Sequence, residues 1–393
     1  MKKKQSLAIQ LVMGALCFVN LMYMIPSVAV SGMVAAFPGY NENTVMLLLT
    51  LPNLTGIIGI VSEPLLERWF DRRQLCVAAL AVFFTTGMIS FAFHASLPIL
   101  VAVSALMGIA YGMQSTVFPL LVSGYFEGAQ RSRVMGMATG MLQLGRVVST
   151  LLGGVLADLH WHYIYVCFLM VLVPLVLAGV CLPKEKKRKE ENKQPPKGKG
   201  TFNFPAMIRL SAAGFAFAVL YYVVNTHLSL YVESYGLGSA ATTGVLSAFG
   251  SVIAGIVSLA FSYIEPKTGR FTMACSLAVL GVSYVMSGLW ISLPGAVICM
   301  GGASVGMGLF SPCLMLGCAQ CADARNLPTA TAIVLTIVNV GYFASPYLTG
   351  WAAGFVGDGA APVFAVGGVL ALICAAVLSA VNLKQKHAPC YNE

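Results

Sequence analysis

Arg146 is the only charged residue in the stretch GMLQLGRVVSTLLGG, residues 140–154. A guanidinium carries planar, paired N–H donors that match a carboxylate, a phosphate or a sulfonate. Gln143 lies three residues earlier, on the same face of a helix. The chemistry that these two residues suit is recognition of an organic anion.

The depth of Arg146 makes this interpretation sharper. A helix predicted over 134–158 places Arg146 about 12 residues, or roughly 18 Å, from its cytoplasmic end. An arginine at the centre of a bilayer costs at least ~2.5–3.5 kcal/mol, so it needs a counter-charge or a wet cavity. All fourteen Asp and Glu fall in loops or at span ends, and Asp158 on the same helix is three turns away. The substrate is therefore the favoured counter-charge. A structural role, with hydrogen bonds to carbonyls and neutral side chains, or a misplaced span are the alternatives.

Other polar side chains occur at comparable depth. They are Asn20, Tyr23, Asn53, Tyr111 and Gln114 in the first half, and Tyr221, Tyr222, Asn225, Ser251, Asn339 and Tyr342 in the second. For each one alone, a hydrogen bond between helices is the alternative to a ligand contact. Together they predict a polar cavity between the halves. His227, the one histidine inside a predicted span, is a candidate for carrying a coupling proton, against an interfacial, hydrogen-bonded histidine.

These residues must be positioned by membrane-spanning helices. Hydrophobic residues make up 58% of the 393 residues and charged residues only 9%, against about 25% charged in a soluble domain. Hydropathy predicts an all-α membrane protein whose twelve spans lie at 8–30, 44–62, 74–93, 98–123, 134–158, 162–182, 205–231, 240–263, 271–291, 295–318, 328–352 and 361–383.

Basic residues sort to one side of these spans. Of the 23 Lys and Arg, 22 fall on one face and only Arg146 does not. The positive-inside rule then places both termini in the cytoplasm. The net charge of +9 follows from topology, so nucleic acid is not an expected partner.

The chain divides at a hydrophilic segment. Residues 183–200, PKEKKRKEENKQPPKGKG, have no aliphatic side chain and predict a cytoplasmic linker. We expect a six-helix half over 1–182, a linker over 183–204 and a second six-helix half over 205–393. Residues 145–150 and 341–346 share a Gly-x-x-x-Ser pattern at an offset of 196 residues, which indicates that the two bundles are pseudo-symmetric repeats.

This layout resembles the major facilitator superfamily over nearly the whole chain. The family motif Gly-x-x-x-Asp-Arg-x-Gly-Arg-Arg is similar to residues 63–73, EPLLERWFDRR, although the glycines are missing and one residue is extra. Residues 266–270, PKTGR, are the counterpart in the second half. The resemblance implies a cytoplasmic gate of Glu67, Arg68, Asp71, Arg72, Arg73, Lys267 and Arg270. The alternative is that these charges only set topology.

Two departures argue against a proton-coupled drug antiporter. Ser104 stands where those proteins usually have an arginine, and the Gly-Pro of their helix-five motif is absent before Gly153 and Gly154. The sequence therefore predicts a secondary active or facilitative transporter of a small organic anion by alternating access, working by uniport, exchange or symport. The alternative is an efflux transporter of amphipathic compounds in which Arg146 is structural.

Other function classes find little support. The sequence has no catalytic motif and no ATP-binding loop, so neither an enzyme nor a cofactor is expected. Cys318 and Cys321 have metal-like spacing, but they stand alone, and packing is the expected role. Short outer loops favour a bacterial inner membrane, and we expect a monomer.

Overall fold

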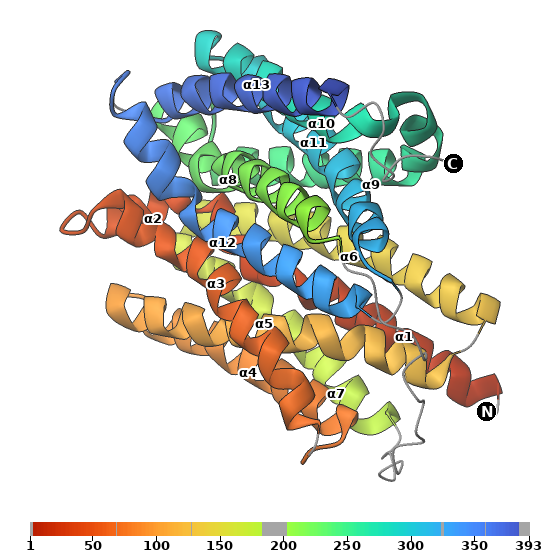
Figure 1. Ribbon diagram of the computed structural model, residues 1–393. Helices are drawn as coiled ribbons and strands as arrows, with labels where there is room; N and C mark the ends of the chain where they lie inside the picture. Colours follow the sequence, from red (N-terminus) through yellow and green to blue (C-terminus); the bar gives the residue numbers. More distant parts are fainter. Residues whose placement is uncertain are drawn as a thin grey trace. The chain divides into compact units, whose positions relative to one another are not determined.

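The computed structural model describes residues 3–67, 69–126, 128–182, 203–323, 326–357 and 359–384. These residues form helices joined by short loops, as Figure 1 shows. In chain order the elements are α1 (Lys3–Asn20), η1 (Met22–Val28), α2 (Val30–Ala36), α3 (Glu42–Leu66), α4 (Arg72–Ala92), α5 (Leu97–Tyr125), α6 (Gly128–Leu159), η2 (Trp161–Val171), α7 (Leu172–Cys181), α8 (Phe204–Ser234), α9 (Ala240–Thr268), η3 (Gly269–Phe271), α10 (Thr272–Leu289), α11 (Leu293–Cys321), α12 (Leu327–Ala353) and α13 (Ala360–Lys384).

Helix starts follow from local side-chain chemistry. The side chain of Asn41 accepts a hydrogen bond from the N–H of Asn43 (3.0 Å) where α3 begins. The Ser292 hydroxyl oxygen accepts from the N–H of Gly295 (3.2 Å) at the start of α11. Asp71 and Gln74 form a reciprocal capping box at α4. Such caps satisfy N–H groups that the first helical turn leaves without a partner.

The described residues contain eleven helical segments that are long and apolar enough to cross a bilayer. One of them, Ala240–Leu289, is 50 residues long and covers two of the twelve predicted spans. A helix of that length would measure about 75 Å, far more than the ~30 Å hydrocarbon core. The segment turns at η3, where Gly269 has a φ of +48°. Its length is therefore enough for two crossings.

Two predicted spans are not continuous α-helices. The first, 8–30, is built from α1, the 3-10 helix η1 and part of α2, and Pro26 lies inside η1. Because proline has no N–H to donate, it interrupts the α-helical hydrogen-bond pattern at this point. The sixth, 162–182, begins as the 3-10 helix η2 and continues as α7.

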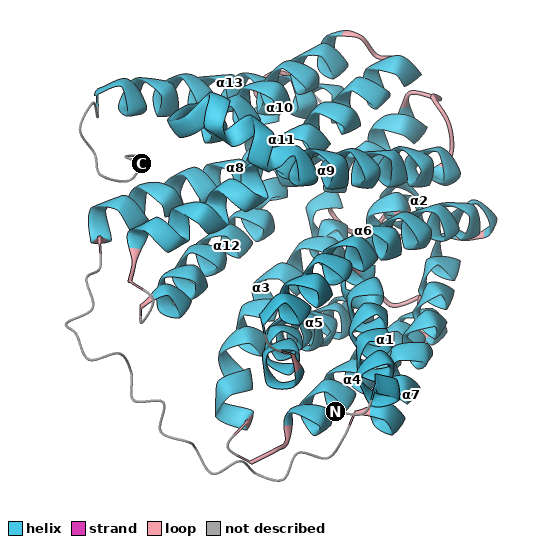
Figure 2. Ribbon diagram, turned by 90° about the vertical axis from the view of Figure 1, so that its right-hand side faces the viewer, coloured by secondary structure: helices cyan, strands magenta, loops and turns pink. Residues whose placement is uncertain are grey.

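The chain forms two compact units. One contains residues 1–191 together with 240–248, and the other contains 192–239 and 249–393. In the first unit α3 packs on α5 and α1 on α6, and in the second α8 packs on α12 and α10 on α13 (Figure 2). Most of the predicted linker, residues 183–202, lies outside the described residues.

The packing of α3 on α5 depends on glycine. A Cβ on Gly112 would overlap the carbonyl oxygen of Gly56, and a Cβ on Gly108 would overlap the Thr55 hydroxyl. A Cβ on Gly59 would overlap the carbonyl oxygen of Ile109. Small residues allow membrane helices to approach backbone to backbone, where van der Waals contact replaces the hydrophobic effect as the attraction.

We therefore expect Gly112→Ala to destabilise the protein. Overpacking of a tight contact costs about 1–3 kcal/mol, and neither backbone can withdraw without separating the helices. The melting temperature of the purified protein in detergent should fall by about 1–4 °C. Gly140→Ala on α6 is the matched control, because a Cβ there meets nothing within 4 Å. An equal response of the two variants would contradict the glycine contact.

Candidate functional site

Arg146 lies in the middle of α6, 18 residues after Gly128 and 13 before Leu159. It falls in the apolar segment Gly140–Leu159. The residue is half-buried and its Nε atom is buried. The preceding residue, Gly145, lies directly against the backbone of Phe18 on α1. Arg146 is therefore held near the level of Asn20, the last residue of α1. Gln143, the residue predicted to act with it, is also half-buried.

The acid at the end of the same helix is engaged elsewhere. Asp158 Oδ1 accepts a hydrogen bond from the N–H of Ala241 (3.1 Å), in the first turn of α9. A carboxylate at that position satisfies a free N–H and suits the positive end of the helix dipole. Close contact between Gly154 and Gly244 brings the two helices together there. Asp158 thus acts as a cap for α9.

Three predicted site residues form one cluster in the first unit. The hydroxyl of Tyr23, on η1, donates to Asn53 Oδ1 on α3 (3.1 Å), and both side chains are buried. The rings of Tyr23 and Tyr111, on α5, have centroids 4.3 Å apart. Asn53 Nδ2 donates to its own helix at the carbonyl of Leu49 (3.1 Å). Three separate elements therefore meet through one polar group and one aromatic pair.

Asn20 and Gln114 lie on a second feature, a cavity of about 240 Å³ between α1, α5 and α6. Gln114 Nε2 donates to the carbonyl of Leu16 (2.9 Å). The side chain is only 2% exposed, and its Oε1 atom has no hydrogen-bond partner among the described protein atoms. The cavity is lined by Leu16, Cys17, Asn20, Gln114, Ser115, Phe118, Ala138 and Leu142.

In the second unit most of the predicted residues lie on α8 and α12. Tyr221, Tyr222 and Asn225 are buried on α8. The ring of Tyr222 lies 5.2 Å from that of Tyr342 on α12, centroid to centroid. Hydrogen bonds from Tyr284 Oη to the carbonyl of Tyr221 (3.2 Å) and from the N–H of Val224 to Tyr284 Oη (3.2 Å) join α10 to this part of α8.

The other predicted residues of this unit lie on α9, α12 and α8. Ser251 is buried on α9 and Asn339 is half-buried on α12, one turn before Tyr342. His227 is buried on α8 with 4% of its surface exposed, and its Nδ1 lies 2.8 Å from Thr226 Oγ1. The histidine is thus enclosed by protein.

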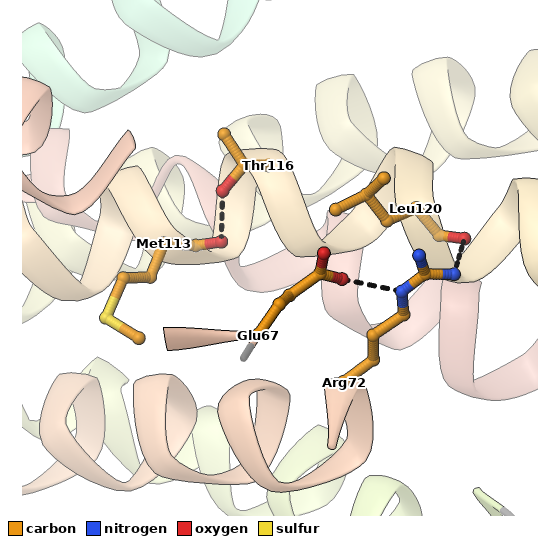
Figure 3. A network of polar contacts seen from close by, with 5 residues as sticks. All are labelled: Glu67, Arg72, Met113, Thr116 and Leu120. Carbon is orange, nitrogen blue, oxygen red and sulfur yellow. Dashed lines mark hydrogen bonds and ion pairs between the residues drawn. The ribbon is translucent and has the colours of Figure 1, made fainter. Parts of the chain in front are cut away.

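The predicted gate residues of the first half make hydrogen bonds and an ion pair. Arg72 Nε binds Glu67 Oε1 at 2.6 Å, and Arg72 Nη1 donates to the carbonyl of Leu120 on α5 (3.5 Å), as Figure 3 shows. Arg73 donates to the carbonyl of Gly179 on α7. Asp71 serves as the cap of α4, and Arg68 lies outside the described residues. The α3–α4 connection is thereby fastened to α5 and α7.

The second-half counterparts are arranged differently. Lys267 is in the last turn of α9, and the guanidinium of Arg270 lies 5.1 Å from the ring centroid of Phe271. Asn382 Nδ2 on α13 donates to the carbonyl of Arg270 (2.7 Å). Here the backbone of the turn makes the contact to a neighbouring helix.

Glu63 is the polar residue that the sequence argument overlooked. It is 1% exposed near the end of α3, and its Oε1 atom has no hydrogen-bond partner among the described protein atoms. A signal was present, because Glu63 stands where the family motif has a glycine.

The fold and these polar clusters are those of a multi-pass membrane protein with polar side chains gathered inside its helical units. The sequence matches the family model of the Major Facilitator Superfamily over residues 11–322. The chain belongs to this superfamily and is a membrane transporter of a small molecule, as the sequence predicted.

Solved structures show the same fold. A bacterial homolog of the human lysosomal transporter Spinster matches with a TM-score of 0.71 and 14% identity, covering 99% of this chain and 100% of that one. A D-xylose–proton symporter matches with 0.70 and 15%, covering 95% and 96%. A POT family transporter in complex with 5-aminolevulinic acid matches with 0.74 and 12%, also covering 95% and 96%.

Two named transporters are similar in sequence. A putative tartrate transporter of Agrobacterium vitis is 22% identical over 307 residues, 68% of this chain and 69% of that protein. Myo-inositol transporter 3A of Cryptococcus neoformans var. grubii is 28% identical over 115 residues. That second match spans 28% of this chain and only 20% of the inositol transporter.

We expect Tyr23→Phe to lower stability, because the variant removes the buried hydroxyl that donates to Asn53. Loss of such a bond costs about 1 kcal/mol, or roughly 1–2 °C in the melting temperature of a chain of this length. Tyr40→Phe is the control, because Tyr40 is exposed and its hydroxyl lies outside the cluster. Equal melting temperatures for wild type and Tyr23→Phe would show that the bond contributes nothing.

Proposed function

We propose that this transporter moves a small organic anion by alternating access, with Arg146 as the anion anchor. The observation that carries the proposal is the place of Arg146: mid-helix, in an apolar segment, with a buried guanidinium nitrogen. Placing a cation there is costly, and a carboxylate that binds it bidentately offsets the cost. Gln143, one turn away on the same face, supplies an amide beside the bound group.

The sequence relatives support a small polar substrate. Tartrate is a hydroxylated dicarboxylate and therefore a partner for a guanidinium, and the similarity to the putative tartrate transporter extends over two thirds of this chain. Inositol is a neutral polyol, and the similarity to its transporter is much shorter. Of the two substrate chemistries, the anion also accounts for Arg146.

In this proposal one set of polar residues binds the substrate and a second set acts as the cytoplasmic gate. Tyr23, Asn53, Tyr111, Asn20 and Gln114 in the first half, and Tyr221, Tyr222, Asn225, Ser251, Asn339 and Tyr342 in the second, contact the substrate. Glu67, Asp71, Arg72, Arg73, Lys267 and Arg270 hold helix ends together in one of the alternating states. Transport runs by uniport, by exchange, or by symport in which the proton is carried by His227 or by the substrate itself.

The second candidate is efflux of amphipathic compounds. The aromatic pairs Tyr23–Tyr111 and Tyr222–Tyr342 favour it, because such rings suit a ligand with an apolar body. In that case Arg146 has a structural role. For either substrate we propose a monomer in a bacterial inner membrane.

Arg146→Gln separates the two candidates. Ligand-induced rises in melting temperature are measured for carboxylates, phosphates, sulfonates, neutral drugs and organic cations. For one anion class we expect binding to weaken about 10- to 100-fold in the variant, since hydrogen bonds to a charged group are lost. Arg209→Gln, at an exposed arginine of α8, is the matched control and should bind as wild type does. Stabilisation by neutral or cationic amphiphiles, unchanged in Arg146→Gln, would replace the anion proposal by the efflux candidate.

A further inference from the structure

The amide of Gln114 has a fixed orientation. Its Nε2 donates to the main-chain carbonyl of Leu16 (2.9 Å), and a carbonyl accepts only from the NH2 side of an amide. The other end, Oε1, is therefore an acceptor that cannot exchange places with the nitrogen. It is buried, and the residue lines the cavity between α1, α5 and α6. A buried amide oxygen of this kind favours a partner that brings an O–H or N–H group.

The rest of the cavity agrees with such a partner. Asn20 contributes a second amide. The hydroxyl of Ser115 donates to the carbonyl of Gly112 (2.7 Å), so its oxygen is left to act as an acceptor. The volume of about 240 Å³ equals roughly eight waters at their ~30 Å³ share of the liquid. Phe118 and Leu16 give apolar walls. The cavity has the size and the polarity for the hydroxyl-bearing carbons of a small acid.

Arg146 lies one helical turn beyond this cavity. Ala138 and Leu142 line it from α6, and Arg146 follows Leu142 by four residues, which puts all three on one helix face. The step from Leu142 to Arg146 is about 6 Å along the axis. Contact between Gly145 and Phe18 sets Arg146 at the level of Asn20. Arg146 therefore lies about one helical turn along α6 from a cavity to which α1 and α5 contribute hydrogen-bond acceptors.

We propose that this cavity is a hydroxyl-recognition subsite, in which Gln114 Oε1 accepts a hydrogen bond from a hydroxyl of the anion whose carboxylate binds Arg146. The substrate class is a short hydroxylated carboxylic acid, and the subsite discriminates against acids of the same skeleton without hydroxyls. This inference rests on the proposed function for the binding of the substrate's carboxylate to Arg146. The binding of the substrate's hydroxyl is inferred from Gln114 alone.

The test compares hydroxy acids with their deoxy counterparts from three to six carbons, including tartrate, malate and succinate. Dissociation constants are measured on the purified full-length protein by calorimetry. For at least one skeleton we expect wild type to bind the hydroxy acid about tenfold more tightly, because the deoxy acid leaves the buried amide oxygen without a donor. This comparison needs no variant and does not depend on the folding of one.

Gln114→Met should remove the preference while deoxy acids bind as before. Thr86→Val is the matched control, because its buried hydroxyl on α4 donates to its own helix (Phe83 carbonyl, 2.9 Å) away from the cavity. Arg146→Gln should weaken a hydroxy acid and its deoxy counterpart by the same factor. Equal binding of each pair in wild type, or a preference that survives in Gln114→Met, overturns the subsite and leaves the anion proposal standing.

The two proposals fail separately. If no acid binds but myo-inositol does, and Gln114→Met abolishes its binding, the anion proposal is overturned and Gln114 keeps its role as the hydroxyl acceptor. If neither acids nor inositol bind, both are overturned.

Discussion

The hydrocarbon core of a bilayer offers no water to backbone N–H and C=O groups, and this constraint underlies the rest of the structure. Each span must satisfy its backbone internally, so it is helical. Buried hydroxyls obey the same rule and bond to carbonyls of their own helix, as Thr50 does to Met46 (3.2 Å) and Thr86 to Phe83 (2.9 Å). Only polar groups that reach another helix add information about tertiary structure. Tyr23, Gln114 and Tyr284 are of that kind.

The helical architecture and the family were predictable because apolar length and charge placement record the membrane directly. Span ends were less so. A hydropathy window does not detect that the part of the first span around Pro26 is a 3-10 helix, nor that Ala240–Leu289 remains helical almost without a break. These outcomes depend on local hydrogen-bond patterns, and average apolarity contains no trace of them.

The candidate site was predicted residue by residue, but its grouping was not. Sequence depth suggested Asn20, Tyr23, Asn53, Tyr111 and Gln114 as equivalent members of one lining. The structure separates them into an aromatic cluster on η1, α3 and α5 and a cavity between α1, α5 and α6. Which face of a helix meets which neighbour is decided by packing, and glycine contacts such as Gly145 on Phe18 set it. Glu63 was overlooked because a carboxyl near the end of a span is expected to be exposed to water.

Two different kinds of contact hold α3 and α5 together. Backbone contact at Gly56 and Gly112 holds α3 to α5 along their length, and Arg72 joins Glu67 to the Leu120 carbonyl at their end. Sliding one helix along the other would break the glycine contact. Tilting one helix away from the other would separate Arg72 from one of its two acceptors. Helices α3 and α5 are thus joined both along their length and at one end. A movement of this unit that keeps both contacts intact must therefore carry α3 and α5 together.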